Sequence, residues 1–446
     1  HYLWSAMPLA ASIMVFTEQP TPRLRYVMDH LLGHLLGLGT IYGHDAAEAL
    51  AWDGPLLQYG GKALPGALYF PSSAIFFEEG THASTVEAAH SGAAGGLFPV
   101  DGGPWPYDPF ASAFFLLTRY EEYLPFTPDA LGRFPSTASA LLSLGSLDIP
   151  WVDRWAFELA DLLETCFPGL RCTRPVFSFQ PGYDIDVAYA YLGRPWWRSA
   201  GAGLRDALRG DGRALRQRMK VLAGLEPDHY DVYGWLDALH ERHALVPRWF
   251  VQVGPRGERD HNLSPRHPLV SGLIRHLDQD GGVGLHPSYS HGSDLEGLRN
   301  ERIILEQVTG RVITASRQHY LMLSVPETWN RLVAEGFTED HTLGFADSPG
   351  FRAGTSRPFP WFDLRSGLQR PLTIHPFAVM DGTLKEYLGL GPGKALDRLG
   401  RLIGNVRRYG GVFSTLWHNS TLSEQGEWKG WRQVYQRMVE EMINTP

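Results

Sequence analysis

The sequence predicts an α/β fold in which strands and helices alternate along the chain. Beyond about residue 172, short apolar segments bounded by glycine or proline alternate with segments whose apolar residues recur at helical spacing. Several of the apolar segments end in Asp, His or Arg. Because this alternation is typical of parallel sheets, whose strands end at a common edge, we expect those polar side chains to meet in one site.

The first predicted strand is "VFSFQPGYDID" (176–186), which ends in two aspartates. Further strands are predicted over 246–254, 281–289, 311–321, 372–380 and 411–420, and helices over 235–245, 269–277 and 324–337, with one more ending at Gly310. Two of these helices begin with S-x-x-E capping boxes, in which serine and glutamate side chains bond the free N–H groups of the first turn. The boxes are Ser293 with Glu296 and Ser324 with Glu327.

Composition indicates two domains. The 446 residues carry a formal net charge of −8 and are 43% hydrophobic and 12% aromatic, which is typical of a globular protein. The segment "CFPGLRCTRP" (166–175) contains two prolines and a glycine and separates a Gly-, Ala- and aromatic-rich region from the alternating region. We predict an α+β N-terminal domain of unknown role over 1–172 and a second domain over 173–446.

Composition also argues against several functions. Mild acidity does not suit a nucleic-acid partner, and no apolar segment approaches the roughly 18 residues needed to cross a bilayer. Cys166 and Cys172 are too few for a disulfide framework and lack the spacing of structural zinc sites. We therefore expect a cytoplasmic protein, although a chain that starts at His1 leaves room for a removed N-terminal segment.

One basic segment, 194–220, carries eight Arg or Lys residues against Asp206 and Asp211. Its apolar residues recur at helical spacing, at Leu204, Leu208, Leu215, Met219 and Leu222. We expect an amphipathic helix with a solvated basic face. The alternative is a patch for an anionic glycan or a lipid-phosphate headgroup, which would allow peripheral membrane contact.

Asp184 and Asp186 lie two residues apart, so their side chains share one face of the strand. Two neighbouring carboxylates repel each other unless cations offset their charge. A divalent ion on Asp186 and the guanidinium of Arg317 on Asp184 would do so. Asp184 could then take a proton from water made acidic by the ion, while His418 protonates the leaving group.

Five segments together resemble the carbohydrate esterase family 4, or NodB-like polysaccharide deacetylases. In chain order they are "GYDIDVAY" (182–189), "GLHPSYSH" (284–291), "SRQHYL" (316–321), "GFTEDHTLGF" (336–345, with Asp340) and "FSTLWHNS" (413–420). The resemblance spans about residues 175–425. "FADSPGFRAGTSRPFPWFD" (345–363) and "DPFASAFFLLTRYEEYLPF" (108–126) resemble an uncharacterised bacterial branch often found with surface-polysaccharide genes.

This resemblance implies a distorted (β/α) barrel and hydrolysis of N-acetyl groups on a sugar. It implies one divalent metal ion, with zinc expected first and cobalt or nickel as alternatives. Asp184 would be the catalytic base, Asp186 and His286 metal ligands, and His418 the acid. Arg317 would contact the base.

The chain departs from the family pattern at the third metal ligand. The family's second histidine would fall at position 290, where this sequence has Ser290. We predict His291 as the third ligand, with Ser290, His319, His375 or an additional water as alternatives. For contact with the sugar we predict Arg352, Tyr289 and Trp417.

The resulting hypothesis is a metal-dependent hydrolase that removes N-acetyl groups from sugars of a bacterial surface polysaccharide or its precursor. One alternative is a glycan-binding or scaffolding protein that has lost its metal. Another is an amide or formamide hydrolase acting on a substrate other than a glycan. Metal content separates the enzymes from the binding protein, and a substrate panel separates the two enzymes.

Overall fold

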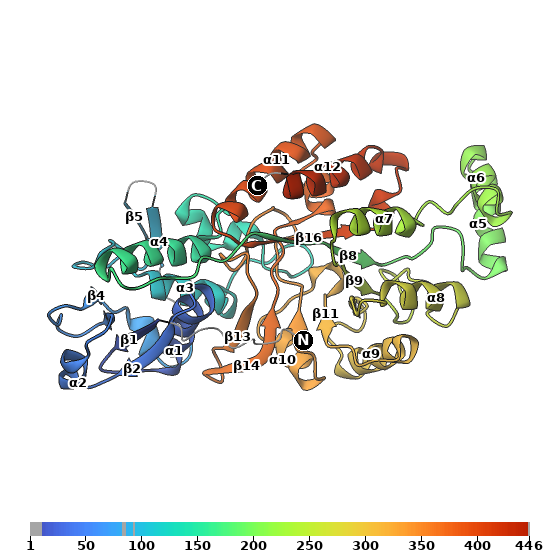
Figure 1. Ribbon diagram of the computed structural model, residues 1–446. Helices are drawn as coiled ribbons and strands as arrows, with labels where there is room; N and C mark the ends of the chain where they lie inside the picture. The colour runs from blue at the N-terminus through green and yellow to red at the C-terminus, as the bar shows by residue number, and fades with distance from the viewer. Residues whose placement is uncertain (1–10, 83–85, 92–93, 445–446) are drawn as a thin grey trace. The chain divides into compact units, whose positions relative to one another are not determined.

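A computed structural model describes residues 11–82, 86–91 and 94–444 (Figure 1). The chain forms two compact units, each assembled from separate stretches of sequence. The first unit contains the residues up to Ser178 together with Gly350–Pro376 and Gly404–Phe413. The second contains Phe179–Pro349, Phe377–Ile403 and the residues from Ser414 onward. Both mix helices with strands, which confirms the predicted α/β class.

The first unit contains a parallel sheet with the strand order β2-β1-β3-β4. Its strands are β1 (Ser12–Phe16), β2 (Gly39–Gly43), β3 (Leu56–Tyr59) and β4 (Leu68–Phe70). The other elements of this unit include α1 (Pro22–Met28), α2 (Ala46–Ala51), α4 (Trp151–Cys166), and two antiparallel hairpins, β5 (Ala88–Ser91) with β6 (Ala94–Leu97) and β13 (Phe359–Asp363) with β14 (Leu368–Ile374).

Helix α3 (Pro109–Leu117) forms the centre of the first unit, since every one of its residues is buried. Asp108 starts the helix by accepting hydrogen bonds from the backbone N–H groups of Phe110 and Ala111, both at 3.0 Å. The apolar sequence "PFASAFFLL" therefore forms a helix that is apolar on all sides, as expected for a core helix.

A buried ion cluster joins the loop after α3 to Arg352, which comes from the Gly350–Pro376 stretch of the same unit. Nε and Nη2 of Arg352 donate to Glu122, at 2.9 and 2.6 Å, and Nε of Arg119 donates to the same carboxylate at 2.8 Å. Arg352 is only 1% exposed. Its guanidinium therefore braces the loop inside the first unit and is not offered to a glycan, in contrast to the prediction that Arg352 contacts the sugar.

The second unit is built on a parallel sheet that curls into a half-barrel. Its strands follow the order β12-β11-β10-β9-β8-β16-β15, and each neighbouring pair is parallel. They are β8 (Gly182–Ile185), β9 (Arg248–Val251), β10 (Val283–Leu285), β11 (Ala315–Ser316), β12 (Glu339–Asp340), β15 (Val379–Met380) and β16 (Val412–His418).

Helices follow or precede these strands as the alternating pattern predicts. They are α7 (Tyr233–His243), α8 (Pro268–Leu277), α9 (Leu295–Thr309), α10 (Glu327–Ala334), α11 (Pro392–Arg408) and α12 (Trp431–Asn444). Gly310 ends α9 with φ at 77°, which confirms its predicted role as a helix stop. No helix within the described ranges is long and apolar enough to cross a membrane.

Three predicted elements differ from the structure for local reasons. The predicted strand 311–321 keeps strand pairing only at Ala315–Ser316, because Tyr320 and Leu321 turn the chain with positive φ angles. The N-cap of α9 is Asp294 rather than Ser293, since the Asp294 carboxylate accepts from two backbone N–H groups of the first turn. The basic helix predicted within 194–222 is two helices, because Gly210 (φ 71°) breaks it.

Candidate active site

The candidate active site lies where β8, β10, β11 and β16 end. These strands are parallel neighbours or next neighbours, so their carboxyl ends share one edge of the sheet. His418, the last residue of β16, pairs in register with Asp184 of β8. The short polar segments after β10 and β11 begin with His286 and Arg317. Parallel pairing alone therefore gathers residues that are more than 200 positions apart in sequence.

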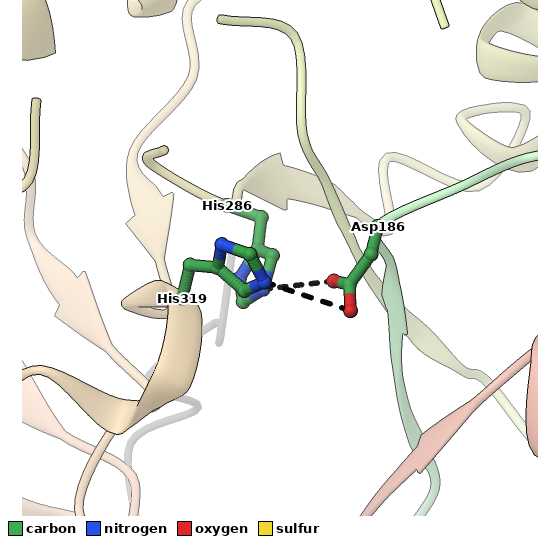
Figure 2. A group of neighbouring side chains, drawn as sticks. All are labelled: Asp186, His286 and His319. Atoms are coloured by element: carbon green, nitrogen blue, oxygen red, sulfur yellow. Dashed lines mark ion pairs between the residues drawn. The ribbon is translucent and has the colours of Figure 1, made fainter. Parts of the chain in front are cut away.

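Three side chains form a group that could hold a metal ion: Asp186, His286 and His319 (Figure 2). One ligand atom from each lies within 4.8 Å of the others. Nε2 of His286 is 3.2 Å from Oδ1 of Asp186, and Nε2 of His319 is 3.6 Å from its Oδ2. Two imidazoles and a carboxylate are a ligand set that zinc commonly takes in catalytic sites.

The hydrogen bonds of the two histidines define which nitrogen faces Asp186. Nδ1 of His286 lies 2.6 Å from the carbonyl oxygen of Arg317, which can only accept, so this nitrogen carries a proton. Nδ1 of His319 lies 3.1 Å from Oδ1 of Asp260 and 3.0 Å from Nε2 of Gln252, which itself donates to Asp260 at 2.6 Å. The carboxylate can only accept, so a proton on Nδ1 satisfies it. In the neutral rings, Nε2 then offers a lone pair toward Asp186. Metal-bound histidines are held in this way by carbonyl and carboxylate groups behind them.

Oδ1 of Asp186 and Nε2 of His286 are buried and face each other at 3.2 Å, and neither makes a hydrogen bond among the described residues. Burial without a partner is costly for such groups, and a cation between them would remove the cost. Burial alone would raise the pKa of Asp186, but the His286 and His319 imidazoles lower it well below its usual range. The residues present therefore fit a divalent cation.

Asp184 is buried beside this group and is paired with Arg317. Nη1 of Arg317 donates to Oδ1 of Asp184 at 3.0 Å, while its Nε donates to the carbonyl oxygen of His341, also at 3.0 Å. The guanidinium carbon lies 4.3 Å from the centre of the Phe250 ring. A side chain at Gly182 would put its Cβ 2.8 Å from Nη2 of Arg317, so glycine leaves room for this arginine. Arg317 thus orients Asp184 and offsets its charge.

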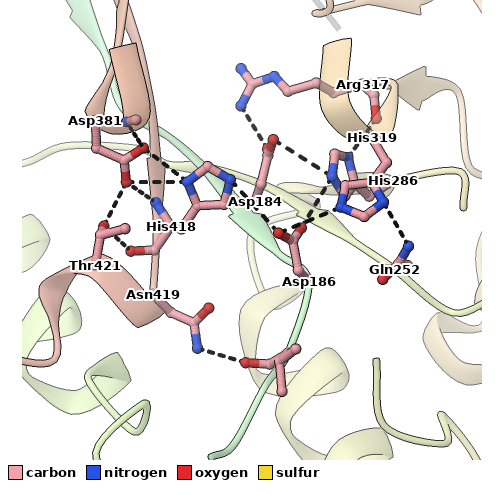
Figure 3. Close-up of polar contacts among 12 residues, drawn as sticks. Asp184, Asp186, Gln252, His286, Arg317, His319, Asp381, His418, Asn419 and Thr421 are labelled. Carbon is pink, nitrogen blue, oxygen red and sulfur yellow. Dashed lines mark hydrogen bonds and ion pairs between the residues drawn. The ribbon is translucent and has the colours of Figure 1, made fainter. Parts of the chain in front are cut away.

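His418 approaches the group from the opposite side (Figure 3). Its Nδ1 lies 2.9 Å from Oδ1 of Asp381, and its Nε2 lies 3.8 Å from Oδ2 of Asp186. Because the Asp381 carboxylate only accepts, Nδ1 carries a proton and Nε2 faces the site. Burial alone would lower the pKa of His418, but Asp381, with Asp186 and Asp184 nearby, raises it to about 10. The arrangement keeps a protonated imidazole within the site.

The structure differs from the prediction at the third ligand. His291 turns away, and its Nδ1 lies 2.9 Å from Glu301 of α9. Ser290 bonds Asp260 instead, since its Oγ donates to Oδ2 of Asp260 at 3.0 Å. Of the alternatives predicted for the third ligand, it is His319, from the segment after β11, that joins Asp186 and His286 in the group that could hold a metal.

Of the predicted sugar contacts, Trp417 lies in the core, whereas Tyr289 lies near the surface beside Tyr320. Trp417 is fully buried and packs on Tyr435 with ring centres 4.9 Å apart, so it belongs to the core and cannot stack on a sugar. Tyr289 is half-buried and lies 5.7 Å from the ring of Tyr320, which is exposed. The guanidinium carbon of Arg259 lies 4.4 Å from the Tyr289 ring centre. Tyr289, Arg259 and Tyr320 therefore lie beside His319, because Tyr320 directly follows His319 in the chain.

Asp340, the acidic residue of the fourth segment, lies behind the site. Its carboxylate accepts from Nε1 of Trp329 at 3.0 Å and from the Thr342 hydroxyl at 2.6 Å. Burial raises the pKa of Asp340 to about 6, against the opposing effect of these hydrogen bonds and of nearby Arg317. Its contacts position the backbone after β12.

Three supporting residues were not anticipated from the sequence. Asp381 follows the short strand β15, and the rule that flagged the other strand ends could have found it. Asp260 lies in a loop far from any strand end, and nothing in the sequence marks it. Asn419 donates to the carbonyl oxygens of Val187 and Ala188, at 3.1 and 3.3 Å, and so anchors the chain directly after Asp186.

Comparison with known proteins finds one family model that matches part of the chain and several similar solved structures. Residues 13–168 match a family of unknown function (DUF7033). No curated protein matches the chain. Similar solved structures include a Mycobacterium smegmatis protein assigned as a polysaccharide deacetylase, at 15% identity and a TM-score of 0.40, covering 61% of this chain and 85% of that chain.

Two further solved structures are similar at comparable levels. The polysaccharide deacetylase Bc1974 from Bacillus cereus is 10% identical with a TM-score of 0.29, covering 60% of this chain and 88% of that one. A 4-alpha-glucanotransferase from Thermococcus litoralis is 12% identical with a TM-score of 0.34, covering 61% of this chain and 37% of that one. At these identities the likenesses concern the fold alone, so function is inferred from the side chains of the site.

Proposed function

We propose that this protein is a metal-dependent hydrolase that removes N-acetyl groups from sugars of a bacterial surface polysaccharide or its precursor. The observation that carries the proposal is the group of Asp186, His286 and His319, whose donor atoms converge between Asp184 and His418. The sugar and the polysaccharide context come from the motif resemblance.

A divalent ion held by the three ligands would polarise the amide carbonyl and make water a better nucleophile at neutral pH. Asp184 would accept the proton of the attacking water, with Arg317 holding its carboxylate in place. His418 would donate a proton from Nε2 to the departing amine, and Asp381 would hold the ring in the required orientation. In this proposal, each side chain that transfers a proton is held by a partner: Asp184 by Arg317 and His418 by Asp381.

Aromatic side chains beside the ligands suit a sugar ring. Tyr320 is exposed, and its ring centre lies 4.4 Å from that of His319. Tyr289 and Arg259 adjoin it, and Nη1 of Arg259 is buried without a hydrogen-bond partner in the described part of the chain. Sugar rings stack on such surfaces and hydroxyl groups accept from such donors. We propose these three residues as the sugar contacts.

The test is elemental mass spectrometry of purified, dialysed protein, beside the Asp186→Ala and Asp184→Asn variants. We expect about one equivalent of zinc or a similar ion in the wild type and in Asp184→Asn, and none in Asp186→Ala. Acetate release from N-acetylated oligosaccharides should occur only with the wild type. A wild type that retains no metal after reloading with zinc, cobalt and nickel would contradict the proposal and favour a glycan-binding protein without hydrolytic activity.

A further inference from the structure

The basic segment predicted from the sequence forms a helical hairpin in the second unit. Its helices are α5 (Trp196–Leu208) and α6 (Gly212–Leu222), which lie side by side at the end of a long connection from β8 (Figure 1). Nη2 of Arg218 bonds Asp206 at 2.8 Å and joins the two helices. The hairpin takes no part in the candidate active site.

The hairpin exposes large apolar side chains to solvent. Trp196 is 81% exposed and Leu208 is 80% exposed. The other exposed apolar residues of this region are Trp197, Leu204, Met219, Leu222 and Leu225. At 100° per residue, positions 197, 204 and 208 lie within about 40° of one another around α5. They form a continuous apolar stripe, and clustered exposure of this kind marks an interaction surface.

A pocket of about 330 Å³ beside α5 is lined by arginines. Five of its eight lining residues are Arg194, Arg198, Arg205, Arg218 and Arg256, and none is acidic. Within the described residues, Arg218 alone of the five forms an ion pair. Burial, together with neighbouring Arg256 and Arg218, lowers the pKa of Arg194. Arginines held this close around a pocket with no acidic lining residue are suited to binding an anion such as phosphate.

The arginines and the apolar stripe are adjacent on the same helix. Arg198, Arg205 and Arg209 lie roughly 80–120° around α5 from the stripe. This is the arrangement of helices that lie in the boundary of a bilayer, where apolar residues enter the acyl region and basic residues meet lipid phosphates. Tryptophans at one end suit the same boundary, since their rings are amphipathic.

We propose that the α5–α6 hairpin docks on the surface of a bilayer that contains anionic phospholipids, with the arginine pocket receiving lipid phosphate groups. A soluble polyanion would account for the arginines but not for the exposed Trp and Leu side chains. A second copy of the chain would bury the apolar stripe but offer no anion to the four arginines of the pocket other than Arg218, which pairs with Asp206. The inference does not depend on the proposed metal chemistry.

The test is co-sedimentation of the full chain with vesicles of phosphatidylcholine alone or with about one third phosphatidylglycerol. We expect binding at least about tenfold tighter to the anionic vesicles. Hydrogen exchange should slow in residues 196–222 when these vesicles are present. Inorganic phosphate and pyrophosphate, added without lipid, test for a soluble ligand of the same pocket.

Two sets of variants separate the two features. Arg198→Gln with Arg205→Gln should weaken binding by about fivefold per arginine, and Trp197→Ser with Leu208→Ser by about tenfold or more. Matched controls lie elsewhere in the second unit. Exposed Arg242→Gln with Arg275→Gln and exposed Val246→Ser with Val312→Ser should bind as the wild type does. Circular dichroism and metal content verify that each variant folds.

Loss of vesicle binding in both hairpin variants, with the circular dichroism spectrum of the wild type, would support the proposal. Failure of the wild type to bind anionic vesicles would overturn it. So would equal binding to neutral vesicles, or phosphate binding without vesicle binding. Self-association that the Trp197→Ser and Leu208→Ser changes abolish, in a chain that does not bind vesicles, would also overturn it and assign the stripe to a second copy.

Discussion

Nε2 of His319 lies 3.6 Å from Oδ2 of Asp186, while the histidine nearer to the expected sequence position, His291, is bonded to Glu301. The third member of the group that could hold a metal therefore comes from the segment after β11 rather than from the segment after β10. Asp260 links the two segments, because it bonds both His319 and Ser290.

His319→Ala should lose the metal, whereas His291→Ala should keep it. The reason is that His319 supplies one of three donor atoms, and removal of one leaves a site too poor to retain the ion through dialysis. Metal equivalents by elemental mass spectrometry give the answer. Retention of metal by His319→Ala and its loss by His291→Ala would reverse the assignment.

Asp184→Asn should keep the metal and lose at least about a hundredfold in kcat, since an amide cannot take the proton from water. Arg317 would still bond the amide oxygen, so the fold around the site should persist. Acetate release and metal content are measured on the same preparation. Wild-type turnover in Asp184→Asn would show that another group is the base.

Asp381→Asn should lower kcat by about tenfold to a hundredfold and shift the alkaline limb of its pH profile to lower pH. Asp381 raises the pKa of His418, so its neutralisation lets the imidazolium lose its proton at a lower pH. Thr421→Val is the matched control, because Thr421 donates to Asp381 at 2.5 Å but leaves the carboxylate in place. An unchanged alkaline limb in Asp381→Asn would argue against His418 as the acid.

Asp340 should make the metal-free protein less stable as pH rises from about 4 to about 6. The folded protein holds the Asp340 proton up to about pH 6, whereas the unfolded chain releases it near 3.8. The resulting decrease in the free energy of unfolding reaches on the order of 3 kcal/mol and is constant above pH 6. The Asp340→Asn variant should not show this decrease. Urea midpoints measured at pH 4.5 and pH 7 test this. Asp397 is exposed, so Asp397→Asn should leave the pH dependence of stability unchanged. If the stability of both variants depended on pH to the same extent, the assignment to Asp340 would be contradicted.

Part of the site could be predicted because it depends on strand ends. The alternating pattern predicts where each parallel strand stops, and parallel strands that stop at one edge must gather the residues that follow. Asp184, Asp186, His286, Arg317 and His418 all occupy such positions, and the structure brings them together. Their catalytic roles remain proposals.

The α/β class, the order of the strands along the chain and the residues at their ends could be read from local sequence patterns. Which nearby histidine turns inward could not, because it depends on hydrogen bonds between loops remote in sequence, such as those of Asp260 with Ser290 and His319. The burial of individual side chains could not be read from local patterns either. Trp417 could have faced a sugar by position alone, but packing on Tyr435 places it in the core, because side-chain burial depends on the neighbours that other segments supply.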